Sequence, residues 1–238
     1  PTASAPLQGF ESISGANSAI IGHPKLELNT VPTPQAKLPK LMTTTGAVTM
    51  KNYSPTKAGK KGDFHHTYGA CVVEIVGKTF HLRQLNAVKD GSFMDLDREY
   101  TAEQVRKVEQ LAGLVMGDTH EEFVDPRVVE ATFGPRGIIS ALKPAYLVWH
   151  DIHDGYARNH HHRDNPFIEY AKHHAGLNNV EQALQKTFDF VDQHTPKRCA
   201  NVFVPSNHPD VIARWVREAN PKTDPVNCVF WARTFEAM

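Results

Sequence analysis

Three apolar segments of this chain end in residues of the kinds that bind metal ions. They are GLVMGDTH with Asp118 and His120, AYLVWHD with Asp151, and NVFVPSNH with Asn207 and His208. In a parallel sheet the carboxyl ends of the strands open into one crevice, where ligands bind. Carboxylate, imidazole and amide groups together suit Mn²⁺, Fe²⁺ or Zn²⁺ better than Ca²⁺. The pattern therefore predicts a metal site at the strand ends.

Such a site has a specific chemistry. Two metal ions about 3.5–4 Å apart can hold a phosphate group and lower the pKa of a water molecule between them. An aspartate that gives one oxygen to each ion bridges the pair. Asp151 is the first candidate for this bridge because it directly follows its strand, and Asp154, further into the loop, is the alternative. The predicted reaction is hydrolysis of a phosphate ester.

Histidine is concentrated in the same part of the chain. Ten of the 14 histidines lie between His120 and His208. The loop after Asp151 is rich in histidine and arginine, which hydrogen-bond well to phosphate. It holds the candidate substrate-binding residues His153, Arg158, His161 and Arg163. A polar surface loop is an equally good interpretation of this segment.

The elements that must position these residues follow from the apolar pattern. Apolar strands are predicted over 113–120, 145–151 and 201–208, and helices over 125–133, 178–194 and 209–220. This alternation, with continuously apolar strands, predicts an α/β fold with a parallel sheet covered on both faces. Capping-box spacing between Thr101 and Gln104 predicts a further helix, and residues 226–232 are a candidate fourth strand.

The first 96 residues have a different pattern. Residues 1–45 are rich in Pro, Ser, Thr, Ala and Gly, which predicts a loosely ordered arm. Residues 46–96 are predicted to form a small β-rich unit, with a hairpin over 71–85 that turns at Gly77. Residues 97–238 would then form the unit that carries the metal-binding motifs.

Composition limits the other functional classes. The formal net charge is zero, so bulk charge does not indicate a nucleic-acid or membrane partner. The three cysteines are far apart and odd in number, which argues against a disulfide framework or a zinc ribbon and suits a reducing cytosol. There is no apolar run of the ~20 residues that span a bilayer, and no signal peptide is recognisable. We expect a cytoplasmic protein without a membrane partner; the sequence leaves homo-oligomer formation open.

The order of the motifs adds a resemblance. Strand-Gly-Asp-x-His, strand-x-Asp and strand-x-Asn-His over roughly residues 111–235 resemble the calcineurin-like metallophosphoesterases. The resemblance implies two divalent metal ions, with Mn²⁺ first and Mg²⁺, Fe²⁺ and Zn²⁺ as alternatives. It implies that Asp118 and His120 bind one ion, Asp151 bridges, and Asn207 binds the other. His208 would stabilise the transition state or act as the general acid.

The chain departs from that family at several positions. His150 and Ser206 stand where the family usually has glycine, and Pro209 replaces the familiar aspartate. The family also supplies histidine ligands from later strands, whereas no histidine follows His208 here. The resemblance therefore implies a partial metallophosphoesterase (αββα-type) fold, whose site needs further ligands from outside residues 1–238.

The substrate is suggested by a looser resemblance. Residues 45–75 are similar in style to bacteriophage-encoded phosphoesterase-like proteins, some related to SbcD-type DNA nucleases, which implies DNA cleavage in the host cytoplasm. A nuclease needs a local basic track, for which the candidates are Lys57, Lys60, Lys61, Arg158 and Arg163. The alternatives are a phosphomonoesterase, a nucleotide phosphodiesterase, or a non-catalytic binding or assembly module with a half-formed metal site.

Overall fold

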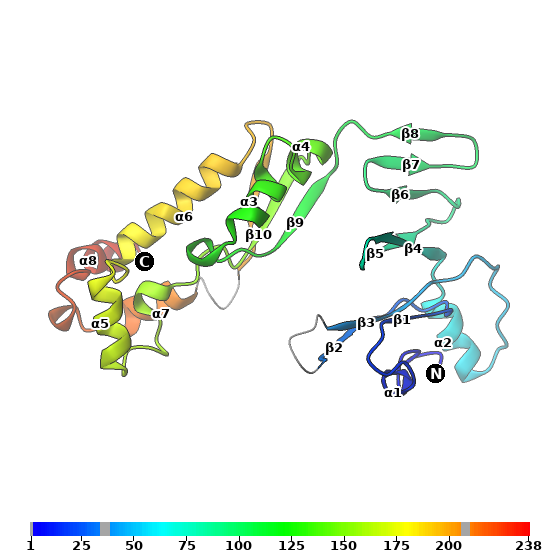
Figure 1. The fold of residues 1–238 in the computed structure, drawn as a ribbon, viewed down its shortest axis with the longest axis horizontal. Helices are drawn as coiled ribbons and strands as arrows, with labels where there is room; N and C mark the ends of the chain where they lie inside the picture. Colours follow the sequence, from blue (N-terminus) through cyan, green and yellow to red (C-terminus); the bar gives the residue numbers. More distant parts are fainter. Residues whose placement is uncertain (1, 34–38, 206–209) are drawn as a thin grey trace. The chain divides into compact units, whose positions relative to one another are not determined.

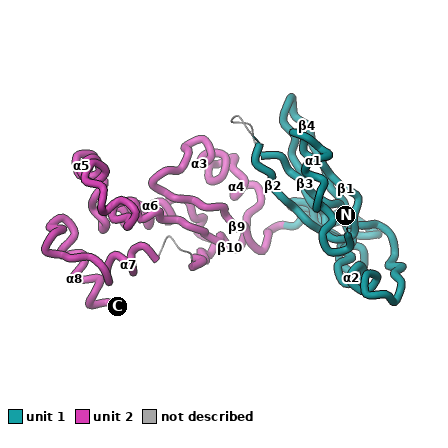
Figure 2. The backbone as a smooth tube through the Cα atoms, turned by 90° about the horizontal axis from the view of Figure 1, so that it is seen from below, with its two compact units in different colours: residues 1–108 teal, residues 109–238 magenta. Residues whose placement is uncertain are grey.

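The structure is a computed structural model that describes residues 2–33, 39–205 and 210–238. The chain divides into two compact units, residues 1–108 and residues 109–238 (Figure 2). Both contain helices and strands, so the chain has a mixed α/β fold.

Unit 1 begins with a short helix and a three-stranded sheet. The elements are α1 (Phe10–Ile13), β1 (Ala19–Ile21), β2 (Leu28–Val31) and β3 (Lys40–Thr44). β3 is central, parallel to β1 and antiparallel to β2. Met42 and Thr44 on β3 are fully buried. Residues 1–45 thus contain regular structure where composition predicted a loosely ordered arm. The Thr44 hydroxyl can be buried because it donates to the Lys25 carbonyl oxygen (2.6 Å).

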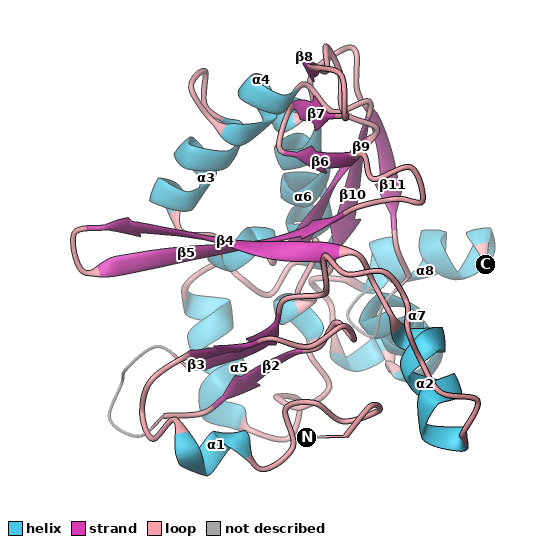
Figure 3. Ribbon diagram, turned by 90° about the vertical axis from the view of Figure 1, so that its right-hand side faces the viewer, coloured by secondary structure: helices cyan, strands magenta, loops and turns pink. Residues whose placement is uncertain are grey.

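The rest of unit 1 is a helix, a hairpin and a small meander (Figure 3). The elements are α2 (Lys57–His65), β4 (Gly69–Val76), β5 (Thr79–Asn86), β6 (Phe93–Asp95), β7 (Arg98–Tyr100) and β8 (Val105–Lys107). The hairpin is confirmed: β4 and β5 pair antiparallel, and Gly77 turns with a φ of 60°. The helix predicted after Thr101 is wrong. Thr101 Oγ1 does accept from the backbone N–H of Gln104 (3.0 Å), but this bond closes the turn between β7 and β8.

Unit 2 is organised around a parallel sheet. Its strands are β9 (Gly113–Asp118), β10 (Tyr146–His150) and β11 (Ala200–Phe203), with β10 in the middle. Both neighbours run parallel to β10. All three predicted strands and their parallel pairing are therefore confirmed, and β11 ends at Phe203 in the described part of the chain.

Six α-helices and three short 3-10 turns complete the described part of unit 2 (Figure 1). They are η1 (Glu121–Phe123), α3 (Pro126–Phe133), α4 (Ile138–Leu142), η2 (Tyr156–Arg158), α5 (Pro166–His174), α6 (Val180–His194), α7 (Asp210–Glu218), η3 (Pro221–Thr223) and α8 (Cys228–Ala237). The predicted helices correspond to α3, α6 and α7. The fourth strand predicted over 226–232 is wrong, since most of that segment is in α8. A short apolar run does not distinguish a strand from a buried helix segment.

The helices pack on one face of the sheet. Leu147 and Trp149 of β10 are buried with Ile139 of α4 and Val191 of α6, and Phe133 of α3 stacks on Trp149 at 5.7 Å. The opposite face carries a row of paired valines, Val115, Val148 and Val202, of which the outer two are 64% and 41% exposed. Among the described residues, the expectation of two covered faces is therefore met on one face only.

A second core cluster lies among the helices of unit 2. Ala157, Val180, Trp215 and Val216 are buried together, and Phe230 of α8 stacks on Trp215. This cluster fixes α7 against α6 and α8 and so positions the segments around Arg158. None of the helices in the described ranges is long and apolar enough to cross a membrane.

Candidate functional site

The carboxyl ends of β9 and β10 bring the predicted ligands to one edge of the sheet. Asp118, the last residue of β9, is paired with His150, and Asp151 directly follows His150. The two loops then stay side by side, because the backbone N–H of His120 donates to the carbonyl oxygen of Asp151 (2.8 Å). The backbone N–H groups of Thr119 and Glu121 likewise donate to the carbonyl oxygens of His150 (3.2 Å) and Ile152 (2.9 Å). Asp118, His120 and Asp151 therefore sit on two neighbouring loops.

The backbone at this edge is strained. His120 and Asp151 each have a φ of 42°, in the left-handed region that side chains with a Cβ rarely adopt. This conformation costs roughly 1–2 kcal/mol per residue. Such strain is concentrated at functional sites, where the surrounding structure holds the residue in place. Here the hydrogen bond between the two backbones links both strained residues.

Asp154 lies beside His120. Its Oδ1 is 3.3 Å from Nδ1 of His120, and its own backbone N–H donates to Glu122 Oε2 (3.0 Å). A carboxylate at one imidazole nitrogen orients the ring and directs the other nitrogen to a metal. Asp154, the alternative candidate for the bridge, thus has the position of an orienting residue.

His153 is in the interior of unit 2. It is 4% exposed, and its Nδ1 is 3.1 Å from both Thr187 Oγ1 and Glu122 Oε1. Burial lowers the pKa of His153, and the neighbouring carboxylates of Glu122 and Asp154 oppose that effect. The structure therefore places this predicted substrate-binding residue where it holds η1 against α6 rather than at the surface.

Glu121 and Glu122 lie next to the predicted metal ligands and were not predicted from the sequence. Both belong to η1, immediately after the Gly-Asp-Thr-His motif. Burial raises the pKa of Glu121, the charge of Glu122 adds to that effect, and the Thr187 hydroxyl lies 3.5 Å from Glu121 Oε2. Two consecutive acidic residues directly after a metal-binding motif were the available signal.

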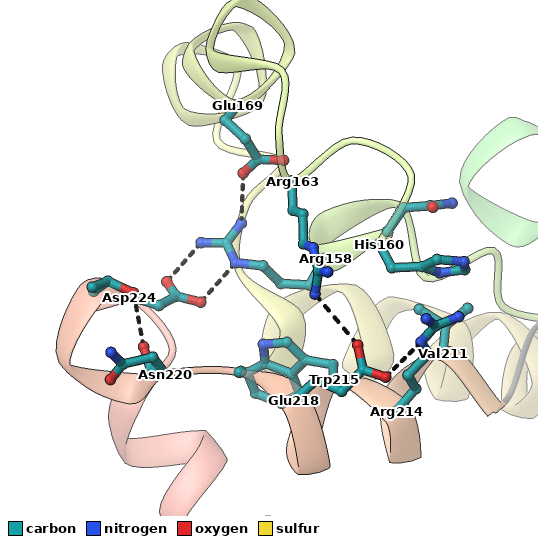
Figure 4. A pocket seen from close by; sticks show the side chains of 13 residues that line it. Arg158, His160, Arg163, Glu169, Val211, Arg214, Trp215, Glu218, Asn220 and Asp224 are labelled. Carbon is teal, nitrogen blue, oxygen red and sulfur yellow. Dashed lines mark hydrogen bonds and ion pairs between the residues drawn. The ribbon is translucent and has the colours of Figure 1, made fainter.

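The other predicted residues of the histidine-rich loop lie elsewhere. Arg158 binds the carboxylate of Asp224 through two nitrogens, each at 2.6 Å, and Arg163 Nη1 is 3.3 Å from Glu218. Both arginines line a pocket with α7 and η3 (Figure 4). His161 is exposed, and its backbone N–H donates to Asn159 Oδ1.

The fit to a metal ion is partial. Asn207 and His208 lie outside the described residues. Among the residues that the structure describes, no group of three or more His, Cys, Asp or Glu side chains could hold a metal ion. Two carboxylates and an oriented imidazole at one strand edge are nevertheless the donor types that Mn²⁺, Fe²⁺ and Zn²⁺ bind. Asp118, His120 and Asp151 supply these donor types, but their side chains do not form such a group in this structure.

Comparison with known proteins gives one informative similarity. The chain is similar to a phage protein. Protein A1 of Escherichia phage T5 is 33% identical over 244 aligned positions, which cover 98% of this chain and 44% of that protein. The chain thus spans less than half the length of this curated relative, and the similarity is consistent with a phage origin. No protein-family model matches the chain, and no solved structure matches it.

Proposed function

We propose that this chain contributes the strand-end half of a metal-dependent phosphodiesterase site, with DNA as the substrate. The observation that carries the proposal is the pair of loops after β9 and β10. They bring Asp118, His120 and Asp151 to one edge of the sheet, with two of these residues in a strained backbone. The finer assignment, a partial metallophosphoesterase (αββα-type) fold, is part of the same proposal.

Each residue has a defined role in this proposal. Asp118 and His120 hold one divalent ion, and Asp151 is shared with a second; Mn²⁺ is the first candidate. When bound, the ions supply a water of lowered pKa and polarise the phosphate. Asp154 orients the His120 ring. The Glu122 carboxylate accepts a hydrogen bond from the backbone N–H of Asp154 and so holds Asp154 in place. Asn207 and His208 keep their predicted roles as a ligand of the second ion and as the group beside the leaving oxygen.

A basic helix face supports nucleic acid as the substrate. Lys57, Lys60 and Lys61 lie on α2 at spacings of three and four residues and are exposed. Residues at these spacings share one face of a helix. Such a face can contact the phosphate backbone in a salt-dependent way. Together with the resemblance to phage nucleases, this favours DNA over a small phosphomonoester.

The test is cleavage of linear DNA by the full-length protein in the presence of Mn²⁺. Asp151→Ala should lower the rate at least about 100-fold, equivalent to about 2.7 kcal/mol of transition-state stabilisation. Asp192→Ala, on the exposed side of α6, is the matched control and should keep the rate. Unchanged cleavage by Asp151→Ala, or cleavage that persists in EDTA, would contradict the proposal.

A non-catalytic binding or assembly module is the second candidate. It is favoured by the partial ligand set, because the described residues do not form a complete metal cluster. This candidate predicts no Mn²⁺ uptake and no phosphoesterase activity from the full-length protein. Turnover of a small phosphomonoester without cleavage of DNA would instead assign a phosphatase.

A further inference from the structure

A pocket of about 400 Å³ lies in unit 2 and contains none of the predicted metal ligands. Its walls come from the histidine-rich loop after η2, from α7 and from η3 (Figure 4). Sites for small organic ligands have volumes of roughly 300–1,000 Å³. The pocket is therefore large enough for a ligand of more than a few atoms.

One wall carries two guanidinium groups with spare donors. Arg163 and Arg214 both bond to the carboxylate of Glu218, at 3.3 Å and 2.9 Å (Figure 4). Arg163 Nε also lies 3.9 Å from the exposed carboxylate of Asp164. Each guanidinium has five N–H donors, so these contacts leave several donors for an anion.

The other wall is internally neutralised. Arg158 binds Asp224 through two nitrogens and lies 3.4 Å from Glu169, which also binds Lys172 (2.7 Å). Two cations thus face two carboxylates. Arg158, which was predicted to contact substrate, ties η2 to η3 and α5.

Trp215 provides a buried donor at the same pocket. Its side chain is almost fully buried (7% exposed), and its Nε1 has no hydrogen-bond partner among the described residues. Figure 4 shows the indole in the pocket wall with its nitrogen on the side of Arg158. The other indoles are satisfied, Trp149 by Asn201 (2.8 Å) and Trp231 by the Val216 carbonyl (2.9 Å). A buried N–H without an acceptor is destabilising, and an acceptor on a ligand would relieve that cost.

His160 adds another unused polar atom. It lines the pocket, and its Nδ1 is buried without a hydrogen-bond partner in the described part of the chain. Burial lowers the pKa of His160, and the charge of Arg214 adds to that effect. The neutral form of the ring is therefore favoured, and its Nδ1 is a hydrogen-bonding position without a partner among the described residues.

We propose that this pocket binds the phosphate group of a nucleotide. Phosphate oxygens accept several hydrogen bonds at once, which suits paired guanidinium groups and an unsatisfied indole N–H. The volume beyond the phosphate leaves room for the nucleoside. The nucleotide is either free or the phosphorylated end of a DNA strand.

The test is calorimetric binding of dAMP to the full-length protein in EDTA. Arg214→Gln and Trp215→Phe should each raise the dissociation constant for dAMP at least tenfold. The matched controls are Arg233→Gln, an exposed arginine paired with Glu181, and Trp231→Phe, whose indole is already satisfied. Both controls should bind dAMP like the unmodified protein, and thermal melting checks that every variant is folded.

The outcomes separate the sources of the ligand. Tighter binding of a 5′-phosphorylated oligonucleotide than of dAMP assigns the pocket to strand ends, and equal or weaker binding assigns it to free nucleotides. Absence of dAMP binding at millimolar concentration, equal affinity for inorganic phosphate, or no effect of the two pocket variants would overturn the proposal. Because EDTA removes metal ions, absence of dAMP binding in this experiment would not bear on the proposed metal site.

Discussion

At the scale of single residues, the backbone of Asp151 is the most specific sign of function in this chain. Its left-handed φ of 42° opposes the preference of an L-residue, and the hydrogen bond from His120 fixes it there. Glycine, asparagine and aspartate are the residues that adopt this conformation most readily. Asp151 combines it with a carboxylate directly after β10.

This strain can be measured. Asp151→Gly should be more stable to urea than Asp151→Ala by about 1 kcal/mol, because glycine adopts a positive φ without a steric penalty. Both variants lack the carboxylate and should lack activity, so stability and function separate. Equal stability of the two variants would show that the position is unstrained.

Some of the site was predictable at this scale. Asp118, His120 and Asp151 could be placed because each lies at the end of a continuously apolar segment. The positive φ values could not be predicted, because neither residue is glycine. The burial of His153 was also hidden, since its partners, Glu122 and Thr187, come from η1 and α6.

At the scale of elements, α8 shows how side-chain hydrogen bonds can determine structure. Asn227, 1% exposed, immediately precedes this helix. Its Oδ1 accepts from the backbone N–H of Val180 (2.8 Å), and its Nδ2 donates to the Asn178 carbonyl (2.9 Å). These bonds join the start of α8 to the start of α6. No apolar pattern in the sequence reports these bonds.

Asn227→Ala should therefore destabilise unit 2 by about 2–3 kcal/mol, since it leaves the buried Val180 N–H and Asn178 carbonyl unsatisfied. Urea denaturation followed by circular dichroism measures the change. Asn52→Ala, at an exposed coil position, is the control and should stay within about 0.5 kcal/mol of the unmodified protein. If Asn227→Ala lowered the free energy of unfolding by less than about 0.5 kcal/mol, contacts other than those of Asn227 would fix α8.

The strands were easier to predict than the connections between them. β9, β10 and β11 are continuously apolar and short, as expected for a parallel sheet. β3 was missed because its buried residues include Thr43 and Thr44, which are polar in the sequence and satisfied only in the fold. Meander strand β8 was missed because the Thr101 turn imitates a helix cap.

At the scale of the whole molecule, the chain is divided after residue 108. The sequence placed the boundary after residue 96, which is 12 residues before the boundary in the structure. The difference arises because β7 pairs with β6 and with β8, and these strands extend unit 1. The proposed metal ligands and the proposed nucleotide pocket both belong to unit 2. The lysine face on α2 belongs to unit 1.

Binding of a metal ion by Asp118, His120 and Asp151 can be observed by anomalous X-ray scattering at the manganese edge, from crystals of the full-length protein grown with Mn²⁺. We expect an anomalous peak within coordination distance of the Asp118 and Asp151 carboxylates, and its loss in Asp151→Ala. Absence of a peak at this edge of the sheet, or a peak that survives Asp151→Ala unchanged, would contradict it.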